Sequence, residues 1–166
     1  YIPEDADVVF CVDAGSIVSK SGIEDNTSAI RAFEKYFSDY YGDEFGAYVK
    51  AMLEDPEKAS GLNLKSRIYL YGTYDAEYEE MGELNILFGI KDRETLLDNI
   101  MTLDNIMTLT YGDFEFEETD DYIYFCNYET AVVLFKNYGY VHYDVDGYMN
   151  DDELDIDEVI EGMKQK

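Results

Sequence analysis

Oxygen-bearing side chains near the C-terminus have the spacing of a calcium-binding loop. They are Asp144, Asp146, Asn150 and Glu153. Counted from His142, they occupy the third, fifth, ninth and twelfth positions, with Gly147 at the sharp turn. His142 is a poor first ligand, because calcium prefers oxygen. The alternative, which we favour, is an Asp-Gly turn before a helix with an acidic first turn. Calcium is the single cofactor considered, and diffuse, weak binding of divalent cations is a further alternative.

Two pairs of tyrosines lie in strand-like segments. Tyr69 and Tyr71 share one face of residues 67–74, and Tyr122 and Tyr124 share one face of residues 122–125. If the two strands are neighbours, the four side chains form a ligand-binding platform that suits a protein or a glycan. The alternative, which we favour, is that helices cover this face and the hydroxyls reach its solvated rim, because the sheet of an α+β domain needs one packed face.

The sequence offers little that could carry out catalysis. His142 is the single histidine, and no nucleophile, zinc-protease or phosphate-loop motif accompanies it in the sequence. Cys11 and Cys126 lie in apolar segments without metal-ligand spacing, so we expect two buried thiols; a disulfide would require adjacent strands. A pair of carboxylates acting as in glycoside hydrolases stays open, since it requires only a suitable separation. We expect a protein that is not an enzyme and has no catalytic residues.

Acidic residues dominate the charge of the chain. Its 166 residues include 38 Asp and Glu against 12 Lys and Arg, a formal net charge of −26. This charge argues against nucleic acid and anionic lipid as partners, because both are bound through Lys and Arg. The 16% aromatic content argues against a disordered acidic tail. The acids concentrate at residues 75–83, 113–121 and 144–161, where cations or a basic partner would bind.

Hydrophobic periodicity predicts an alternation of strands and helices. We expect strands at residues 8–12, 67–74, 84–90, 114–116, 122–125, 131–135 and 138–143. We expect helices at residues 16–20, from a cap at Asn26 or Thr27 to Gly42, at residues 43–54, from Asp92 onward, and from Asp151 onward, with a loop at residues 57–65. The helix that ends at Gly42 carries an apolar stripe at helical spacing, formed by Ile30, Phe33, Phe37 and Tyr40 or Tyr41. The hexapeptide DNIMTL occurs at residues 98–103 and again at 104–109, and we interpret it as a local duplication that lengthens a helix.

The order of these elements predicts an α+β fold. The first elements fit a ferredoxin-like core, a split β-α-β unit, which antiparallel hairpins would then extend. We expect a mostly antiparallel sheet with helices on one face. The length fits a single domain over residues 1–166. Residues 111–166 would be its acidic, β-rich and helical C-terminal part.

Several segments resemble a known family. Residues 1–9 read YIPEDADVV, and residues 52–65 read MLEDPEKASGLNLK before the strand that begins near Ile68. Together they resemble a domain-of-unknown-function family of cell-envelope lipoproteins from Bacteroides-type bacteria. The resemblance covers about residues 1–110. It implies a location in the cell envelope, at the outer membrane or in the periplasm, and implies no known activity.

We therefore expect a non-catalytic, extracytoplasmic interaction module whose partner is a protein or a glycan. The alternatives are an acidic decoy that occupies the site of a basic protein and a weak calcium-binding module. No apolar run reaches the ~18 residues of a transmembrane helix. We expect a signal peptide to have been removed and any membrane attachment to come from a lipid anchor outside this chain.

Overall fold

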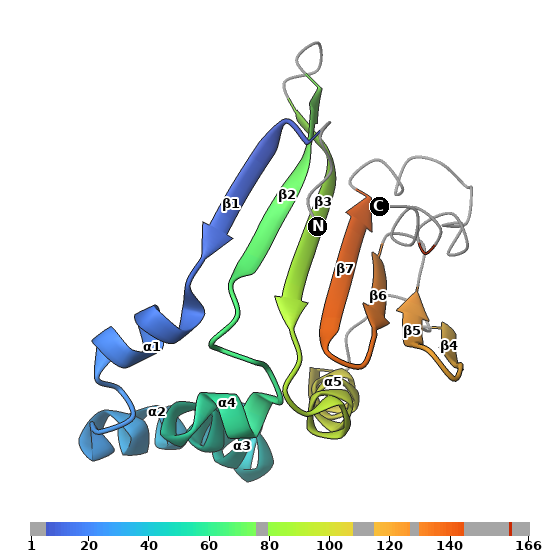
Figure 1. Ribbon diagram of the computed structural model, residues 1–166. Coiled ribbons are helices and arrows are strands. Elements are labelled where there is room, and N and C mark those ends of the chain that lie inside the picture. Colours follow the sequence, from blue (N-terminus) through green and yellow to red (C-terminus); the bar gives the residue numbers. More distant parts are fainter. Residues whose placement is uncertain (1–5, 76–79, 108–114, 127–129, 145–159, 161–166) are drawn as a thin grey trace. The chain divides into compact units, whose positions relative to one another are not determined.

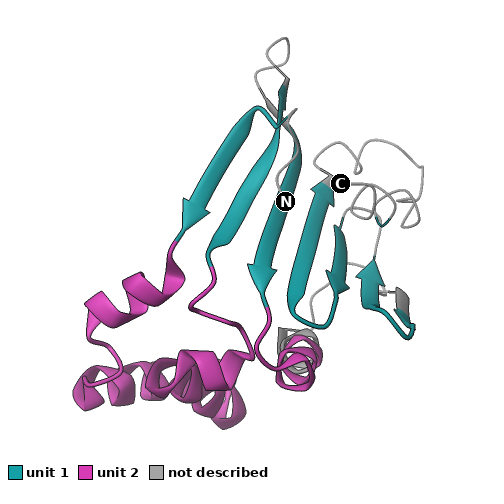
Figure 2. Cartoon of the chain, in the orientation of Figure 1, with its two compact units in different colours: residues 1–12, 67–89, 110–166 teal, residues 13–66, 90–109 magenta. Residues whose placement is uncertain are grey.

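The computed structural model describes residues 6–75, 80–107, 115–126, 130–144 and 160. The chain divides into two compact units, shown in Figure 2. The sheet unit comprises residues 1–12, 67–89 and 110–166, and the helical unit comprises residues 13–66 and 90–109. Each unit is assembled from segments that are far apart in the sequence. The expectation of a single domain over the whole chain stays a prediction.

The sheet unit contains a seven-stranded sheet (Figure 1). Its strands are β1 (Val8–Val12), β2 (Ile68–Asp75), β3 (Glu80–Gly89), β4 (Glu115–Glu118), β5 (Ile123–Cys126), β6 (Thr130–Leu134) and β7 (Tyr138–Asp144). They lie in the order β1-β2-β3-β7-β6-β5-β4, and every neighbouring pair is antiparallel. The presence of this sheet and of the helices of the other unit confirms the expected α+β class. The strand pairing confirms the expected mostly antiparallel sheet.

The ferredoxin-like expectation is wrong in its strand order. A split β-α-β unit requires the strands on either side of a helix to run parallel, with another strand between them. Here the helical segment after β1 returns the chain to β2, the antiparallel neighbour of β1. The strand order, and not the antiparallel pairing, therefore contradicts a ferredoxin-like core. The expectation that the helices cover one face stays a prediction.

The core of the sheet lies around β5, β6 and β7. Ile123 and Leu134 are opposite each other on one face, and Ala131 and Val133 lie on the other face. All four are almost completely buried. This part of the sheet is therefore packed on both sides.

The helices belong to the helical unit. They are α1 (Ala14–Ser21), α2 (Thr27–Tyr41), α3 (Asp43–Glu54), α4 (Pro56–Ser60) and α5 (Arg93–Met107). The helix predicted at 43–54 has the bounds expected for it, and α5 continues through the first DNIMTL copy into the second, which confirms the lengthened helix. No helix among the described residues is both long enough and apolar enough to span a membrane.

The loop expected at residues 57–65 is partly a helix. Asp55 Oδ1 accepts a hydrogen bond of 3.1 Å from the backbone N–H of Lys58, and Pro56 stands at the first helical position. Proline favours that position because it needs no hydrogen bond there. Gly61 ends α4 in the left-handed region at φ 75°. The helix predicted from Asp151 lies outside the described residues except for Ile160, which is helical and buried.

Candidate functional site

The predicted calcium ligands lie almost entirely beyond the part of the chain that the structure describes. Asp144 is the last residue of β7, so a strand precedes the predicted loop, as the sequence indicated. Asp146, Asn150 and Glu153 lie outside the described residues. Within the described ranges, no group of three or more His, Cys, Asp or Glu side chains is placed to hold a metal ion. The calcium hypothesis stays a prediction.

The two tyrosine pairs lie on the same face of the sheet but are not neighbours. Tyr69 and Tyr71 belong to β2 and Tyr124 to β5, while β3, β7 and β6 lie between these strands. The rings of Tyr122 and Tyr124 are 6.3 Å apart, so the second pair is together. Tyr71 is only 7% exposed. The strand order therefore excludes a single platform of four adjacent tyrosines, and a binding role for these residues stays a prediction.

Polar side chains form a row across β2, β3 and β7, which we call the polar row: Tyr71, Asn85 and His142. Asn85 of β3 is 3% exposed and is directly opposite Tyr71 on one side and His142 on the other. Its Oδ1 accepts a hydrogen bond from the hydroxyl of Tyr140 and lies 2.8 Å from Nδ1 of His142. Burial raises the pKa of both Tyr71 and Tyr140. The single histidine is thus held among strands β3 and β7 by an internal network that satisfies a buried amide.

The two cysteines differ in burial. Cys126 is buried in β5, as expected, but Cys11 is exposed on β1. The expectation of two buried thiols is wrong for Cys11, because β1 is an edge strand of the sheet and pairs on one side only. Four strands separate β1 from β5, and the cysteines are not joined to each other.

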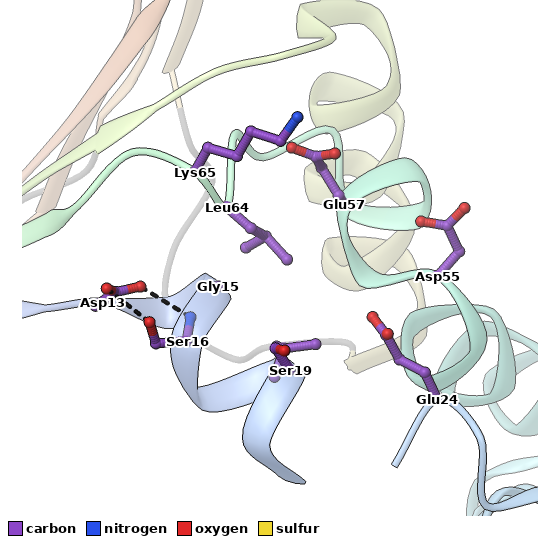
Figure 3. Close-up of a pocket in the computed structure, with 10 residues that line it drawn as sticks. Asp13, Gly15, Ser16, Ser19, Glu24, Asp55, Glu57, Leu64 and Lys65 are labelled. Carbon is purple, nitrogen blue, oxygen red and sulfur yellow. Dashed lines mark hydrogen bonds between the residues drawn. The ribbon is translucent and has the colours of Figure 1, made fainter. Parts of the chain in front are cut away.

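An acidic hollow of about 490 Å³ lies in the helical unit (Figure 3). Its lining includes Asp13, Ser16, Glu24, Asp55, Glu57 and Lys65. Most of its carboxylates already stabilise local structure. Asp13 accepts hydrogen bonds of 2.8 Å from both the backbone N–H and the hydroxyl of Ser16 at the start of α1. Asp55 caps α4, and Glu57 forms an ion pair of 2.5 Å with Lys91. These roles account for the acidity of the hollow without a ligand.

Aromatic side chains of α2 and α3 form the most distinctive exposed feature of the described residues. We call the following group the aromatic surface: Tyr36, Phe37, Tyr40, Tyr41, Phe45 and Tyr48. Tyr36, Tyr40 and Tyr41 are 54%, 71% and 64% exposed. The other members are half-buried, and burial raises the pKa of Tyr48. Large aromatic residues that are exposed together, rather than singly, are typical of an interaction site.

The rings of the aromatic surface contact one another in a continuous series. The ring centroids of Tyr36 and Tyr40 are 4.8 Å apart, and Tyr36 meets Phe37 edge to face at 5.3 Å. Phe37 and Tyr41 both contact Phe45 of the neighbouring helix, at 5.5 and 5.3 Å. Tyr48 extends the series from Phe45 at 6.1 Å. These separations lie within the favourable range for aromatic pairs, so each exposed ring is held by its neighbours.

The charged residues of α2 and α3 differ in whether they form ion pairs. Lys35 is paired with Asp39 at 2.7 Å, and Lys50 is paired with Glu34 at 3.3 Å. Asp43 and Glu44, in the first turn of α3, are exposed beside Tyr41 and Phe45 in the sequence. Acidic residues in this position also interact favourably with the positive end of the helix dipole. The carboxylates of the first turn of α3 are therefore available to a cationic ligand.

The sequence alone did not indicate an interaction surface on α2 and α3. Helical spacing predicted an apolar stripe on α2 through Ile30, Phe33, Phe37 and Tyr40 or Tyr41. In the structure only Ile30 of this helix is buried, and Phe33 is 46% exposed. The available signal was the number of aromatic residues in this helix, since Tyr36 adds a further ring beside a stripe that already ends in Tyr40 and Tyr41.

Comparison of the chain with protein-family models, with curated proteins and with solved structures found no match.

Proposed function

We propose that this chain is a non-catalytic binding protein that engages its partner through the aromatic surface of α2 and α3. The observation that carries the proposal is the mutual contact of Tyr36, Tyr40 and Tyr41 with neighbouring rings while each stays more than half exposed. Isolated exposed aromatic residues are common on soluble proteins, whereas a contiguous group is uncommon and is typical of a binding site.

The chemistry of the aromatic surface supports binding. A tyrosine ring contributes a large apolar area with few rotatable bonds, so ordering it on association costs little conformational entropy. The ring contacts reduce this cost further, because Tyr36 and Tyr41 are already restrained by Phe37 and Phe45. Preorganisation of this kind increases affinity without any new contact.

We further propose that the chain works in the cell envelope. This part of the proposal rests on the resemblance of residues 1–110 to cell-envelope lipoproteins and on nothing in the fold. Fractionation of the source cells, followed by detection of the native protein in the envelope and cytoplasmic fractions, tests it. Recovery in the cytoplasmic fraction would contradict it.

Nuclear magnetic resonance of the tyrosine rings tests the binding role directly. The chain would be titrated separately with a polyarginine peptide, a neutral cello-oligosaccharide and an uncharged peptide rich in leucine. We expect at least one probe to shift the ring signals of Tyr36, Tyr40 and Tyr41 in a saturable manner. A double variant, Tyr36→Ser with Tyr40→Ser, should abolish the saturation.

The matched control is Tyr74→Ser, which removes an exposed tyrosine from β2 in the other compact unit. This control should leave the titration unchanged. If no probe shifts these signals, or if the shifts are confined to Tyr69, Tyr122 and Tyr124 of the sheet unit, the proposed site is wrong.

A further inference from the structure

We infer that the partner of the aromatic surface is a protein segment rich in arginine. This inference rests on the proposed function and adds the chemistry of the partner. Three properties of the described residues lead to it: the electron-rich faces of exposed tyrosine rings, the carboxylates at the start of α3, and the charge of the whole chain.

The exposed rings offer faces to a cation. Tyr40 is 71% exposed and Tyr36 is 54% exposed, and their rings are tilted by 41° to each other, so much of both rings is accessible to a ligand. A guanidinium group placed over a tyrosine face is attracted by the ring quadrupole and can also stack on it. Arginine fits better than lysine, because its planar group stacks and is less strongly hydrated than an ammonium group.

Two exposed carboxylates follow the aromatic residues of α2 in the chain. Asp43 and Glu44 begin α3 directly after Tyr41 and Gly42. Both are exposed, and none of the ion pairs found among the described residues involves either of them. An arginine stacked at the end of α2 could therefore also form a two-pronged hydrogen bond to a carboxylate, which is the strongest geometry for that pair.

The total charge decides between the possible occupants. A second copy of this chain would bring two bodies of −26 together, and their repulsion opposes association. A neutral glycan could stack on the tyrosines but would gain nothing from the acidic field. A basic segment is attracted at long range and is steered to the protein, which accelerates association. Electrostatic complementarity therefore favours the basic segment.

Binding of a polyarginine peptide, measured by calorimetry at low and moderate salt, tests the inference. We expect the Tyr36→Ser, Tyr40→Ser double variant to weaken binding about tenfold, the sum of two exposed cation–π contacts. Asp43→Asn with Glu44→Gln should weaken it about threefold through the loss of exposed charge pairs. A polylysine peptide of equal length should bind more weakly than polyarginine to the original chain, and the tyrosine substitutions should affect it less.

Two matched controls separate a local site from general attraction to an acidic protein. Tyr74→Ser removes an exposed tyrosine elsewhere, and Asp120→Asn with Asp121→Asn removes the same charge from the turn before β5. Both should change polyarginine binding by less than the site variants do. Circular dichroism melting of every variant establishes that the helices are intact.

The remaining outcomes overturn the inference in distinguishable ways. Equal weakening by Asp120→Asn, Asp121→Asn and by the α3 variant would show that net charge alone attracts the peptide. Saturable binding of the oligosaccharide that the Tyr36 and Tyr40 substitutions abolish would contradict an arginine-rich partner but leave the proposed binding surface intact. Self-association of the chain that the same substitutions abolish would also contradict an arginine-rich partner and leave the proposed binding surface intact. If no probe engages the aromatic surface, the proposed function and the inference both fail.

Discussion

At the scale of single residues, two glycines test how the helical unit is packed. Gly61 and Gly22 both end helices in the left-handed region, at φ 75° and 61°. A Cβ on Gly61 would contact Asp92 O and stand 2.7 Å from Leu96 N, whereas a Cβ on Gly22 would meet nothing within 4 Å. Gly61 O also accepts hydrogen bonds from the backbone N–H groups of Lys91 and Asp92. Gly61 therefore couples α4 to the start of α5.

Replacing each glycine by alanine should destabilise the protein to different extents. Gly22→Ala should cost about 1 kcal/mol, the ordinary penalty of a left-handed alanine. Gly61→Ala should cost about 1–3 kcal/mol more, because backbone atoms occupy the space that the methyl group needs. Urea unfolding followed by the helical circular dichroism signal measures the difference. Equal losses for the two variants would show that α4 and α5 do not approach each other at Gly61.

At the scale of the elements, the polar row across β2, β3 and β7 predicts that the protein loses stability at alkaline pH. Burial raises the pKa of Tyr140 well above its ordinary value, and that of Tyr71 is also raised. Unfolded tyrosine ionises near pH ~10. Above that pH the unfolded chain releases protons that the folded sheet retains, so the free energy of unfolding falls as pH rises. The contribution of Tyr140 is at most about 1.4 kcal/mol per pH unit.

Urea unfolding between pH ~8 and ~11 measures this slope. Tyr140→Phe should reduce the slope, although it also costs about 1 kcal/mol at neutral pH through the lost hydrogen bond to Asn85. Tyr36→Phe, which removes an exposed hydroxyl, is the control and should leave the slope unchanged. An identical slope in the Tyr140 variant would contradict a buried, neutral tyrosine in the sheet.

The elements themselves were largely predictable from local pattern. Alternation predicted β2, and helical spacing predicted α2 and α3, with Gly42 as the end of α2. The N-terminal cap of α2 was left open between Asn26 and Thr27, and the structure places it at Asn26. The five-residue helix α4 was missed because it is too short to show a period. The strand order could not be read locally, since β3 pairs with β7 far along the chain, and this pairing separates β2 from β5.

The candidate site was harder to predict than the fold, because periodicity identifies the apolar face of a helix but not what covers it. The spacing through Phe33 and Phe37 indicated a buried stripe, yet among the residues of α2 only Ile30 is buried. Exposure depends on which other segments pack there, and that is a long-range property. The same limit applies to Tyr71, for which the sequence left a ligand platform and a covered face open and favoured the covered face. In the structure Tyr71 is buried beside Asn85.

At the scale of the whole molecule, charge and ion pairing oppose each other. The net charge of −26 destabilises any compact state through repulsion. Among the described residues three ion pairs oppose it, at Lys35–Asp39, Lys50–Glu34 and Lys91–Glu57. All three involve solvent-accessible side chains, and such pairs contribute about 0–1 kcal/mol each. Repulsion should therefore dominate, and added salt, which screens both effects, should stabilise the protein.

Thermal melting in increasing sodium chloride measures that balance, and the expected result is a rise in Tm. Repeating the series with magnesium chloride and calcium chloride at matched ionic strength separates screening from binding. A calcium site that exists only in the folded protein would add about 2.7 kcal/mol at a hundredfold excess over its Kd. A rise with calcium beyond that with magnesium would support the loop from Asp144 to Glu153. Equal curves for all three salts would show that screening alone accounts for the change in Tm. A fall in Tm with sodium chloride would show that the ion pairs outweigh the repulsion.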